Sequence, residues 1–241
     1  MPAAEEKLAA NACWSCDAPV DPAQLFCTNC GKVLPASTSA DYFQVFSLPR
    51  RFSIDSPALE RAFYRLSRKL HPDMYARAGE DEQQWSLRNA SLLNDAYRTL
   101  KDPISRTEYL LRLEGVEIEQ ESKQGQDRVN PSRVPPDLLE EVFELNMQLE
   151  EMRMTRKSGA EDPDLRQDLL NAEKQFESQL AEVDESLRKQ WEEWDDASIV
   201  TDDSNWSEQR RQDAKQQLVA LLDRRRYIRN LVRDVKETLD S

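Results

Sequence analysis

The hydrophobic pattern of the chain is helical along most of its length. Apolar residues recur three or four positions apart, which is the spacing that places them on one face of a helix. In the segment that begins at Ser56, this face consists of Leu59, Phe63, Leu66 and Leu70. Ser56 is predicted to cap this helix with Pro57 at its first position, and Pro72 is predicted to end it. Alternating runs of Val, Ile or Thr are missing, so the pattern predicts an all-α fold.

Short polar segments divide this pattern into blocks. Residues 1–36 contain all four cysteines, residues 41–115 form a first helical unit, and residues 137–241 form a second. The stretch Pro35–Ala40 ("PASTSA") is small and polar and is predicted to connect the first two blocks. Residues 116–136 are polar and contain three prolines, and they are predicted to form the linker between the helical units.

The two helical units differ in the length of their helices. In the first, Asp41 is predicted to cap a short helix, and helices are expected at 81–101 and 103–115 in addition to the one that begins at Ser56. In the second, helices are expected at 137–157 and 163–194, followed by a final helix that ends near the C-terminus. Three long helices joined by short turns predict an antiparallel three-helix bundle.

The composition agrees with a helical protein and limits the classes of partner that the chain is expected to bind. Of the 241 residues, only five are glycine, and the formal net charge is −13. Against this acidic background, the segment from Arg61 to Arg77 is basic, with Asp73 as its only acid. A local basic patch on an acidic chain predicts a specific acidic protein partner, and it argues against nucleic acid, which requires a dominant positive field. No stretch approaches the roughly 18 apolar residues of a membrane span, so no membrane partner is expected.

The four cysteines are spaced C-x2-C-x10-C-x2-C, which predicts a structural metal site. They are Cys13, Cys16, Cys27 and Cys30. Two such pairs can give a tetrahedral Zn²⁺ ion four thiolate ligands, and Gly31 suits the tight turn after the last of them. The alternatives are two disulfides or a redox-active C-x-x-C pair, but no secretory signal and no leftover cysteine accompany the motif. The segment between the outer cysteines contains no Lys or Arg, so a nucleic-acid-binding ribbon is not favoured.

The single histidine is followed by a proline and an aspartate. Taken alone, His71 is compatible with a helix C-terminal residue whose charge favours the helix dipole, with Pro72 ending the helix and Asp73 solvated. A catalytic histidine would need a nucleophile or a metal nearby. The sequence contains no G-x-S-x-G, HExxH or glycine-rich phosphate loop, so we expect no catalysis by this chain.

The order of these motifs resembles the J-domain of DnaJ-family co-chaperones. "DYFQVF" resembles the first J-domain helix, "LERAFYRLSRKLHPD" the second helix with its His-Pro-Asp loop, and "LLNDAYRTLKDPISRTEYL" the third and fourth helices. The resemblance implies contact with a DnaK/HscA-type chaperone ATPase. His71, Pro72 and Asp73 would engage the chaperone, and a basic helix face would dock on its acidic surface. That face comprises Arg61, Arg65, Arg68 and Lys69.

The combination of a tetracysteine module, a J-domain and an acidic helical bundle resembles the HscB family of iron–sulfur cluster assembly co-chaperones. The junction "EYLLRLEGVEI" is close to that of the family. The resemblance implies that the bundle presents an IscU-type cluster scaffold protein to the chaperone. By resemblance, Leu139, Phe143 and Glu144 match scaffold-contact positions, whereas Glu140 stands where the family usually has an apolar residue.

The helical spacing supports a binding face on the first bundle helix. One stripe is predicted to be core and consists of Leu138, Val142, Leu145, Leu149 and Met152. Leu139, Phe143 and Met147 form a second stripe, which we expect to be an exposed client-binding row. The alternative is that both stripes are buried. Trp191 and Trp194 are predicted to pack in the core.

Two alternatives to this function remain open: a J-domain co-chaperone with another client, and a zinc-dependent adaptor that uses the J-like unit only as a scaffold. The resemblance implies the mitochondrial matrix as the compartment. The N-terminal "MPAAEEKLAANACW" has neither the apolar run of a secretory signal nor the arginines of a transit peptide, so a cytoplasmic location is the alternative.

Overall fold

The computed structural model describes residues 11–35, 40–118, 135–159, 162–199 and 208–240. The chain divides into two compact units, at 1–115 and at 116–241. The described residues form helices and two isolated β-bridges, so the prediction of an all-α fold is confirmed. None of the helices in the described ranges has the length and apolar character to cross a bilayer. Most of the predicted linkers at Pro35–Ala40 and 116–136 lies outside the described residues.

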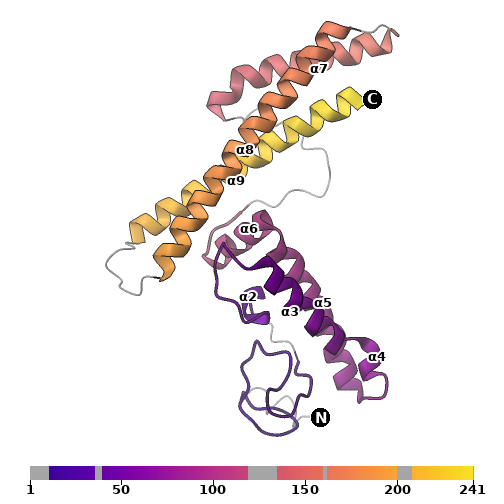
Figure 1. Cartoon of the computed structure of the whole chain (residues 1–241), viewed down its shortest axis with the longest axis vertical. Coiled ribbons are helices and arrows are strands. Elements are labelled where there is room, and N and C mark those ends of the chain that lie inside the picture. Colours follow the sequence, from indigo (N-terminus) through magenta and orange to yellow (C-terminus); the bar gives the residue numbers. More distant parts are fainter. Residues whose placement is uncertain (1–10, 36–39, 119–134, 160–161, 200–207, 241) are drawn as a thin grey trace. The chain divides into compact units, whose positions relative to one another are not determined.

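The helices of the first unit, which Figure 1 shows, pack around a small core of aromatic and aliphatic side chains. They are α2 Tyr42–Val45, α3 Ser56–Lys69, α4 Pro72–Tyr75, α5 Glu80–Lys101 and α6 Pro103–Leu113. Helices α3 and α5 lie side by side, and Phe63 of one stacks on Tyr97 of the other with ring centroids 4.1 Å apart. The fully buried side chains include Phe43, Phe52, Leu59, Leu70, Leu93, Leu100 and Leu111.

Acidic side chains cap α2 and α3. Asp41 caps α2 as predicted, because its carboxylate accepts the backbone N–H of Gln44 at 2.9 Å while the Gln44 side chain accepts the backbone N–H of Asp41. The predicted cap of α3 is wrong by one residue. Asp55 is the cap, because its carboxylate accepts the N–H of Ala58 at 2.9 Å, so that Ser56 is already helical.

The four-cysteine module spans the described residues 11–35 and is built from two similar turns. In each turn a backbone N–H donates back to the carbonyl oxygen of the first cysteine, from Asp17 to Cys13 at 3.0 Å and from Gly31 to Cys27 at 2.9 Å. Both donors have positive φ, +57° and +72°. Glycine adopts this conformation at little cost, so the predicted turn at Gly31 is confirmed, whereas the same conformation at Asp17 was not predicted.

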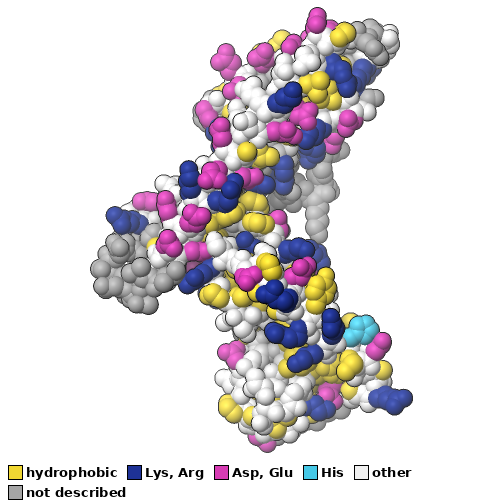
Figure 2. All heavy atoms as spheres, viewed as in Figure 1, with side chains coloured by type: hydrophobic (Ala, Val, Ile, Leu, Met, Phe, Trp, Pro, Cys, Tyr) yellow, Lys and Arg dark blue, Asp and Glu magenta, His cyan; other side chains and the backbone are white. Residues whose placement is uncertain are grey.

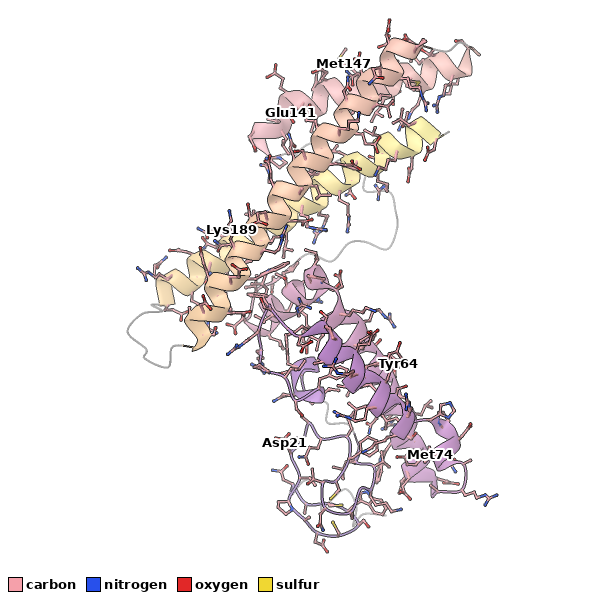
Figure 3. All side chains as sticks on the ribbon, viewed as in Figure 1. Asp21, Tyr64, Met74, Glu141, Met147 and Lys189 are labelled. Carbon is pink, nitrogen blue, oxygen red and sulfur yellow. The ribbon has the colours of Figure 1, made fainter. Side chains whose placement is uncertain are left out.

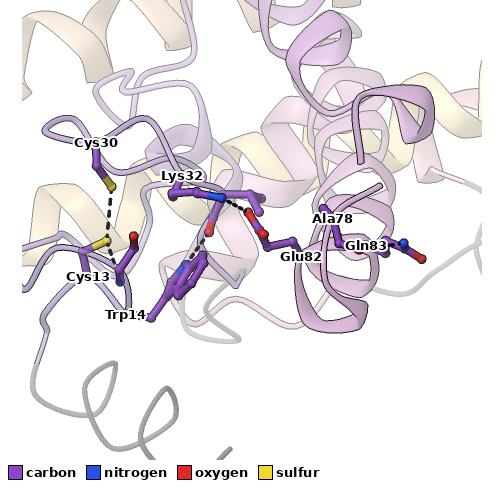
Figure 4. Close-up of polar contacts among 9 residues, drawn as sticks. Cys13, Trp14, Cys30, Lys32, Ala78, Glu82 and Gln83 are labelled. Carbon is purple, nitrogen blue, oxygen red and sulfur yellow. Dashed lines mark hydrogen bonds and ion pairs between the residues drawn. The ribbon is translucent and has the colours of Figure 1, made fainter. Parts of the chain in front are cut away.

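The module packs directly on helix α5. The side-chain amide of Asn89, which is fully buried, donates to the carbonyl oxygen of Leu34 at 2.7 Å. Lys32 forms an ion pair of 2.9 Å with Glu82, drawn in Figure 4. The indole rings of Trp14 and Trp85 pack edge to face, with their ring centroids 5.6 Å apart. The module and helices α2–α6 therefore share one compact unit.

The second unit is a bundle of three helices preceded by a 3-10 turn. These elements are η2 Pro136–Leu138, α7 Leu139–Lys157, α8 Pro163–Ile199 and α9 Glu208–Asp240. Helices α8 and α9 lie side by side as an antiparallel pair, as Figure 1 shows. The predicted first helix begins with a 3-10 turn, and the second continues past its predicted end at Trp194, where Ser198 donates to the Trp194 carbonyl oxygen at 2.8 Å.

Buried apolar side chains and polar contacts hold α7 on the α8–α9 pair. All five residues of the predicted core stripe are at most 4% exposed. Near the end of α7, Arg156 donates to the carbonyl oxygens of Thr238 and Leu239. Near its start, Asp137 pairs with Arg224 at 2.7 Å, and the hydrogen bond from Arg224 lowers the pKa of Asp137. Trp194 is buried as predicted, whereas Trp191 is only half-buried.

Candidate functional sites

The four thiols of the cysteine module converge on one point. Their sulfur atoms all lie within 4.8 Å of one another, with Cys13 to Cys30 at 3.7 Å (Figure 4) and Cys16 to Cys27 at 3.6 Å. Four sulfurs bound to a tetrahedral ion at about 2.3 Å would lie about 3.8 Å apart. All four cysteines are free thiols. The cluster therefore fits a tetrahedral metal ion.

The surroundings of the sulfurs favour the thiolate form that a metal requires at Cys16 but not at Cys30. At Cys30 the hydrogen bond from the backbone of Lys32 is outweighed by burial and by the three neighbouring thiols, which raise its pKa to about 11. The hydrogen bond from the backbone of Ala18, with one from the Asn29 side chain, lowers the pKa of Cys16 to about 6. The Asn29 amide lies 3.6 Å from the Cys16 sulfur, and the backbone N–H of Ser15 lies 3.4 Å from the Cys13 sulfur. The sequence pattern did not indicate a role for Asn29, because its position next to Cys30 was the only available signal.

The His-Pro-Asp loop lies at the end of α3, fully on the surface. Helix α3 ends at Lys69, and His71 caps the following turn α4, because its Nδ1 accepts the backbone N–H of Asp73 at 3.3 Å. The interpretation of His71 as a helix C-terminal residue is therefore wrong. Pro72 comes after the end of α3 and is also the first residue of α4. The side chains of His71 and Asp73 are 60% and 89% exposed.

A buried serine fixes the base of this loop. The hydroxyl of Ser86, on α5, donates to the carbonyl oxygen of Leu70 at 2.8 Å. Leu70 immediately precedes His71, and its carbonyl is otherwise an unsatisfied group at a helix end. The sequence pattern did not indicate this role. The signal that could have indicated it is that Ser86 lies three and seven positions before Asn89 and Leu93, which are buried on the same helix.

The basic residues predicted on α3 all lie on its exposed face. Figure 2 shows dark blue side chains gathered on this part of the first unit, near the histidine drawn in cyan. The four residues are Arg61, Arg65, Arg68 and Lys69. Within the described ranges, no carboxylate forms an ion pair with any of the four. Tyr64 and Met74, on the outside of the unit in Figure 3, are 53% and 71% exposed. They add apolar surface near the loop that the sequence analysis did not identify.

The second stripe of α7 is exposed on the bundle. Leu139, Phe143 and Met147 are 51%, 68% and 59% exposed, and Figure 3 shows Met147 on the outside of α7. The alternative that the bundle buries both stripes is therefore wrong. Met154, which is 69% exposed, falls at the same angle around the helix, and the sequence analysis missed it. Glu144 is also exposed beside this row.

Two family descriptions match the first unit. The DnaJ domain matches residues 41–109, and the zinc-ribbon domain matches residues 9–34. The second match covers all four cysteines, and the first covers the His-Pro-Asp loop and the basic face. Both matches agree with the geometry of the two sites.

Several proteins with similar sequences are named as HscB co-chaperones. The iron–sulfur cluster co-chaperone protein HscB of Homo sapiens is 33% identical over 142 residues, which are 58% of this chain and 57% of that protein. The mouse protein of the same name is 33% identical, and the match covers 61% of each chain. The co-chaperone protein HscB homolog of Photobacterium profundum is 36% identical over 162 residues, which are 65% of this chain and 86% of that protein.

Two solved structures have the same fold. The crystal structure of human co-chaperone protein HscB is 25% identical with a TM-score of 0.64, covering 93% of this chain and 96% of that one. The chaperone HscB from Vibrio cholerae is also 25% identical, with a TM-score of 0.55, covering 83% and 98%.

The sequence match to the human and mouse relatives spans only about three fifths of their lengths, whereas the match to the bacterial relative spans most of it. The structural likeness extends over both units of the chain. Together with the DnaJ domain, these findings show that the chain belongs to the HscB family of co-chaperone proteins.

Proposed function

We propose that this protein stimulates the ATPase of a DnaK/HscA-type chaperone and presents an IscU-type iron–sulfur scaffold protein to it. The observation that carries the first half is the exposed His-Pro-Asp loop at the end of an exposed basic helix face. The observation that carries the second is the exposed apolar row on α7. In this proposal the chain performs no chemistry of its own.

The loop is suited to contact another protein with little ordering cost. Pro72 fixes one backbone angle, the His71 imidazole is held by the Asp73 N–H, and Ser86 anchors the residue before the loop. A preorganised imidazole and carboxylate would bind one conformation of the chaperone better than another. Such differential binding shifts the chaperone toward the state that hydrolyses ATP.

The basic face would accelerate encounter with an acidic chaperone surface. Its charges lie along one side of α3 and end at the loop, so they can orient the loop before contact. Interactions of this kind weaken with salt, because the Debye length falls to about 8 Å at physiological ionic strength. The stimulation should therefore require more of this protein as salt is raised.

The chaperone half is tested by the steady-state ATPase of a purified DnaK-type chaperone. We expect wild-type protein to stimulate it and the His71→Gln variant to lose the stimulation while remaining folded. Arg98→Gln is a matched control, because Arg98 is exposed on α5 and is not part of the basic face. Stimulation that survives His71→Gln would refute this half and favour the adaptor in which the J-type unit is only a scaffold.

The scaffold half is tested by direct binding. We expect Phe143→Ala to weaken the affinity for an IscU-type scaffold at least tenfold, because aromatic side chains at the centre of an interface contribute most of its free energy. Gln216→Ala is the control, since Gln216 is exposed on α9 and does not belong to the row on α7. Unchanged affinity in Phe143→Ala, with wild-type stimulation of the chaperone intact, would indicate a different client.

We also propose that the cysteine cluster holds a structural Zn²⁺ ion with Cys13, Cys16, Cys27 and Cys30 as its ligands. The S₄ ligand set with its tetrahedral spacing is typical of closed structural sites, which leave no coordination position for a substrate. Metal analysis of the purified protein should find one zinc per chain, and a Cys27→Ser variant should lose it. The mitochondrial matrix is the proposed compartment by family resemblance, with the cytoplasm as the alternative, and fractionation of cells would separate them.

A further inference from the structure

A groove of about 700 Å³ lies between the four-cysteine module and the J-type helices. The module contributes one wall, which includes Gln24, Phe26 and Thr28. Helix α3 contributes the opposite wall, which includes Arg65 and Lys69. These two basic residues belong to the proposed chaperone-docking face, so the groove is continuous with that face.

The register of α3 explains this continuity. Lys69 lies four positions after Arg65, so the two side chains are neighbours on one side of the helix. The next strip around the helix includes Ala62 and Leu66, and both also line the groove. The module therefore flanks the part of the basic face formed by Arg65 and Lys69, across the groove.

The module already contacts the last basic residue of this face. The ammonium group of Lys69 lies 5.5 Å from the centre of the Phe26 ring, which is a cation–π geometry. This contact holds the charge at the groove without neutralising it. Within the described residues, neither Arg65 nor Lys69 has a carboxylate partner. The groove thus combines apolar walls with two uncompensated positive charges on one side.

We propose that this groove takes an acidic surface segment of the DnaK-type chaperone, so that the docking surface is composed of both the module and α3. The proposal rests on the proposed function, since the partner is the same chaperone. Charge complementarity selects an acidic occupant. Among the described residues that line the groove, Asp21 is the one acid. It belongs to the module wall and leaves the positive charges on the α3 wall in excess.

Two substitutions of opposite charge at Gln24, made in separate variants, test the proposal. Gln24 is half-buried on the module wall and is not a metal ligand. Gln24→Glu should raise the concentration of this protein needed for half-maximal ATPase stimulation, and Gln24→Lys should lower it. Each effect should be about two- to fivefold at low salt, which is the range for one exposed charge pair. The glutamate keeps an acceptor for the Asp21 backbone N–H, so its effect is not due to loss of that 3.3 Å contact.

The matched controls make the same two charge changes at a glutamine of the second unit. Gln216 is exposed on α9, and Gln216→Glu and Gln216→Lys alter the net charge of the protein identically. We expect both to behave as wild type. Zinc content and the thermal midpoint of all four variants should match wild type, which separates docking from folding.

The outcomes distinguish this inference from the proposed function. Opposite shifts in the two Gln24 variants, absent in the Gln216 pair and reduced at high salt, support it. If wild-type protein stimulates the chaperone and the Gln24 pair does not differ from it, the composite surface is wrong while the co-chaperone function stands. If wild-type protein does not stimulate any DnaK-type chaperone, both proposals fail together.

Discussion

The side-chain amide of Asn89 donates a 2.7 Å hydrogen bond to the carbonyl oxygen of Leu34 in a site that excludes solvent. These residues are 55 positions apart, and the bond joins the end of the four-cysteine module to helix α5. A buried carbonyl that loses its donor costs free energy. The bond therefore links the stability of the module to that of the J-type helices.

Asn89→Ala is expected to destabilise the first unit by about 1–3 kcal/mol, since the Leu34 carbonyl would be left buried without this donor. The loss should appear as a lower midpoint in chemical denaturation followed by circular dichroism. Asn94→Ala, on an exposed position of the same helix, should change stability by less than about 0.5 kcal/mol. Equal effects of the two substitutions would show that the bond does not contribute.

Removal of the metal is expected to destabilise the helices as well as the module. The module has a small core, so metal binding would supply much of its folding free energy. Without it, the Lys32–Glu82 and Trp14–Trp85 contacts on α5 would be lost. A chelator should therefore lower the thermal midpoint of the first unit and change tryptophan fluorescence. The transition of the second unit serves as the internal reference, and an unshifted first-unit midpoint after complete metal loss would contradict the prediction.

Ser86→Ala is expected to impair the His-Pro-Asp loop without changing any surface residue. The substitution removes the donor to the Leu70 carbonyl, at a cost of about 1–3 kcal/mol, and releases the backbone just before His71. We expect a higher concentration for half-maximal chaperone stimulation at a temperature where the variant is folded. Ser91→Ala, exposed on the same helix, is the control. Normal stimulation by a destabilised Ser86→Ala would limit this residue to a structural role.

Met154→Asp is expected to weaken binding to the scaffold protein, because Met154 continues the exposed row of Phe143 and Met147 along α7. A charge in this row would have to be desolvated on binding, so a loss of about tenfold or more is expected. Since Met154 is exposed, the bundle should retain its stability. Calorimetric titration with the scaffold measures the effect. Wild-type affinity would restrict the binding row to its first three residues.

The ionisation of Tyr227 makes the stability of the second unit depend on pH above about 10. Burial raises the pKa of this phenol to about 12, whereas an unfolded tyrosine ionises near 10. The folded state thus holds its proton longer, so the contribution of Tyr227 to stability is present below pH 10 and is lost as the pH rises towards 12. Denaturation of wild-type and Tyr227→Phe proteins across this range should show wild type losing more stability. A constant difference between them would contradict this assignment.

Local patterns in the sequence determined most of the secondary structure and identified the candidate residues of the two sites in the first unit. The core stripe of α7 and the exposed basic face of α3 follow from a period of 3.6 residues, which is a property of the helix itself. The cysteine tetrad can be recognised from the sequence because tetrahedral metal coordination requires short, regular spacings within each cysteine pair. Local reasoning failed at the cap of α3 by one residue, where Ser56 and Asp55 are both good capping residues and only the folded backbone selects between them.

Tertiary structure alone decided which polar residues support the sites and where the module lies. Asn89 and Ser86 look like ordinary polar residues in a helix, and their partners Leu34 and Leu70 are backbone carbonyls that carry no sequence signal. The groove beside Arg65 also exists only because the module, held on α5, lies opposite α3. Contacts between residues distant in sequence depend on the packing of whole elements, whereas helical periodicity and ligand spacing are local, and this is why the sequence indicated the latter and not the former.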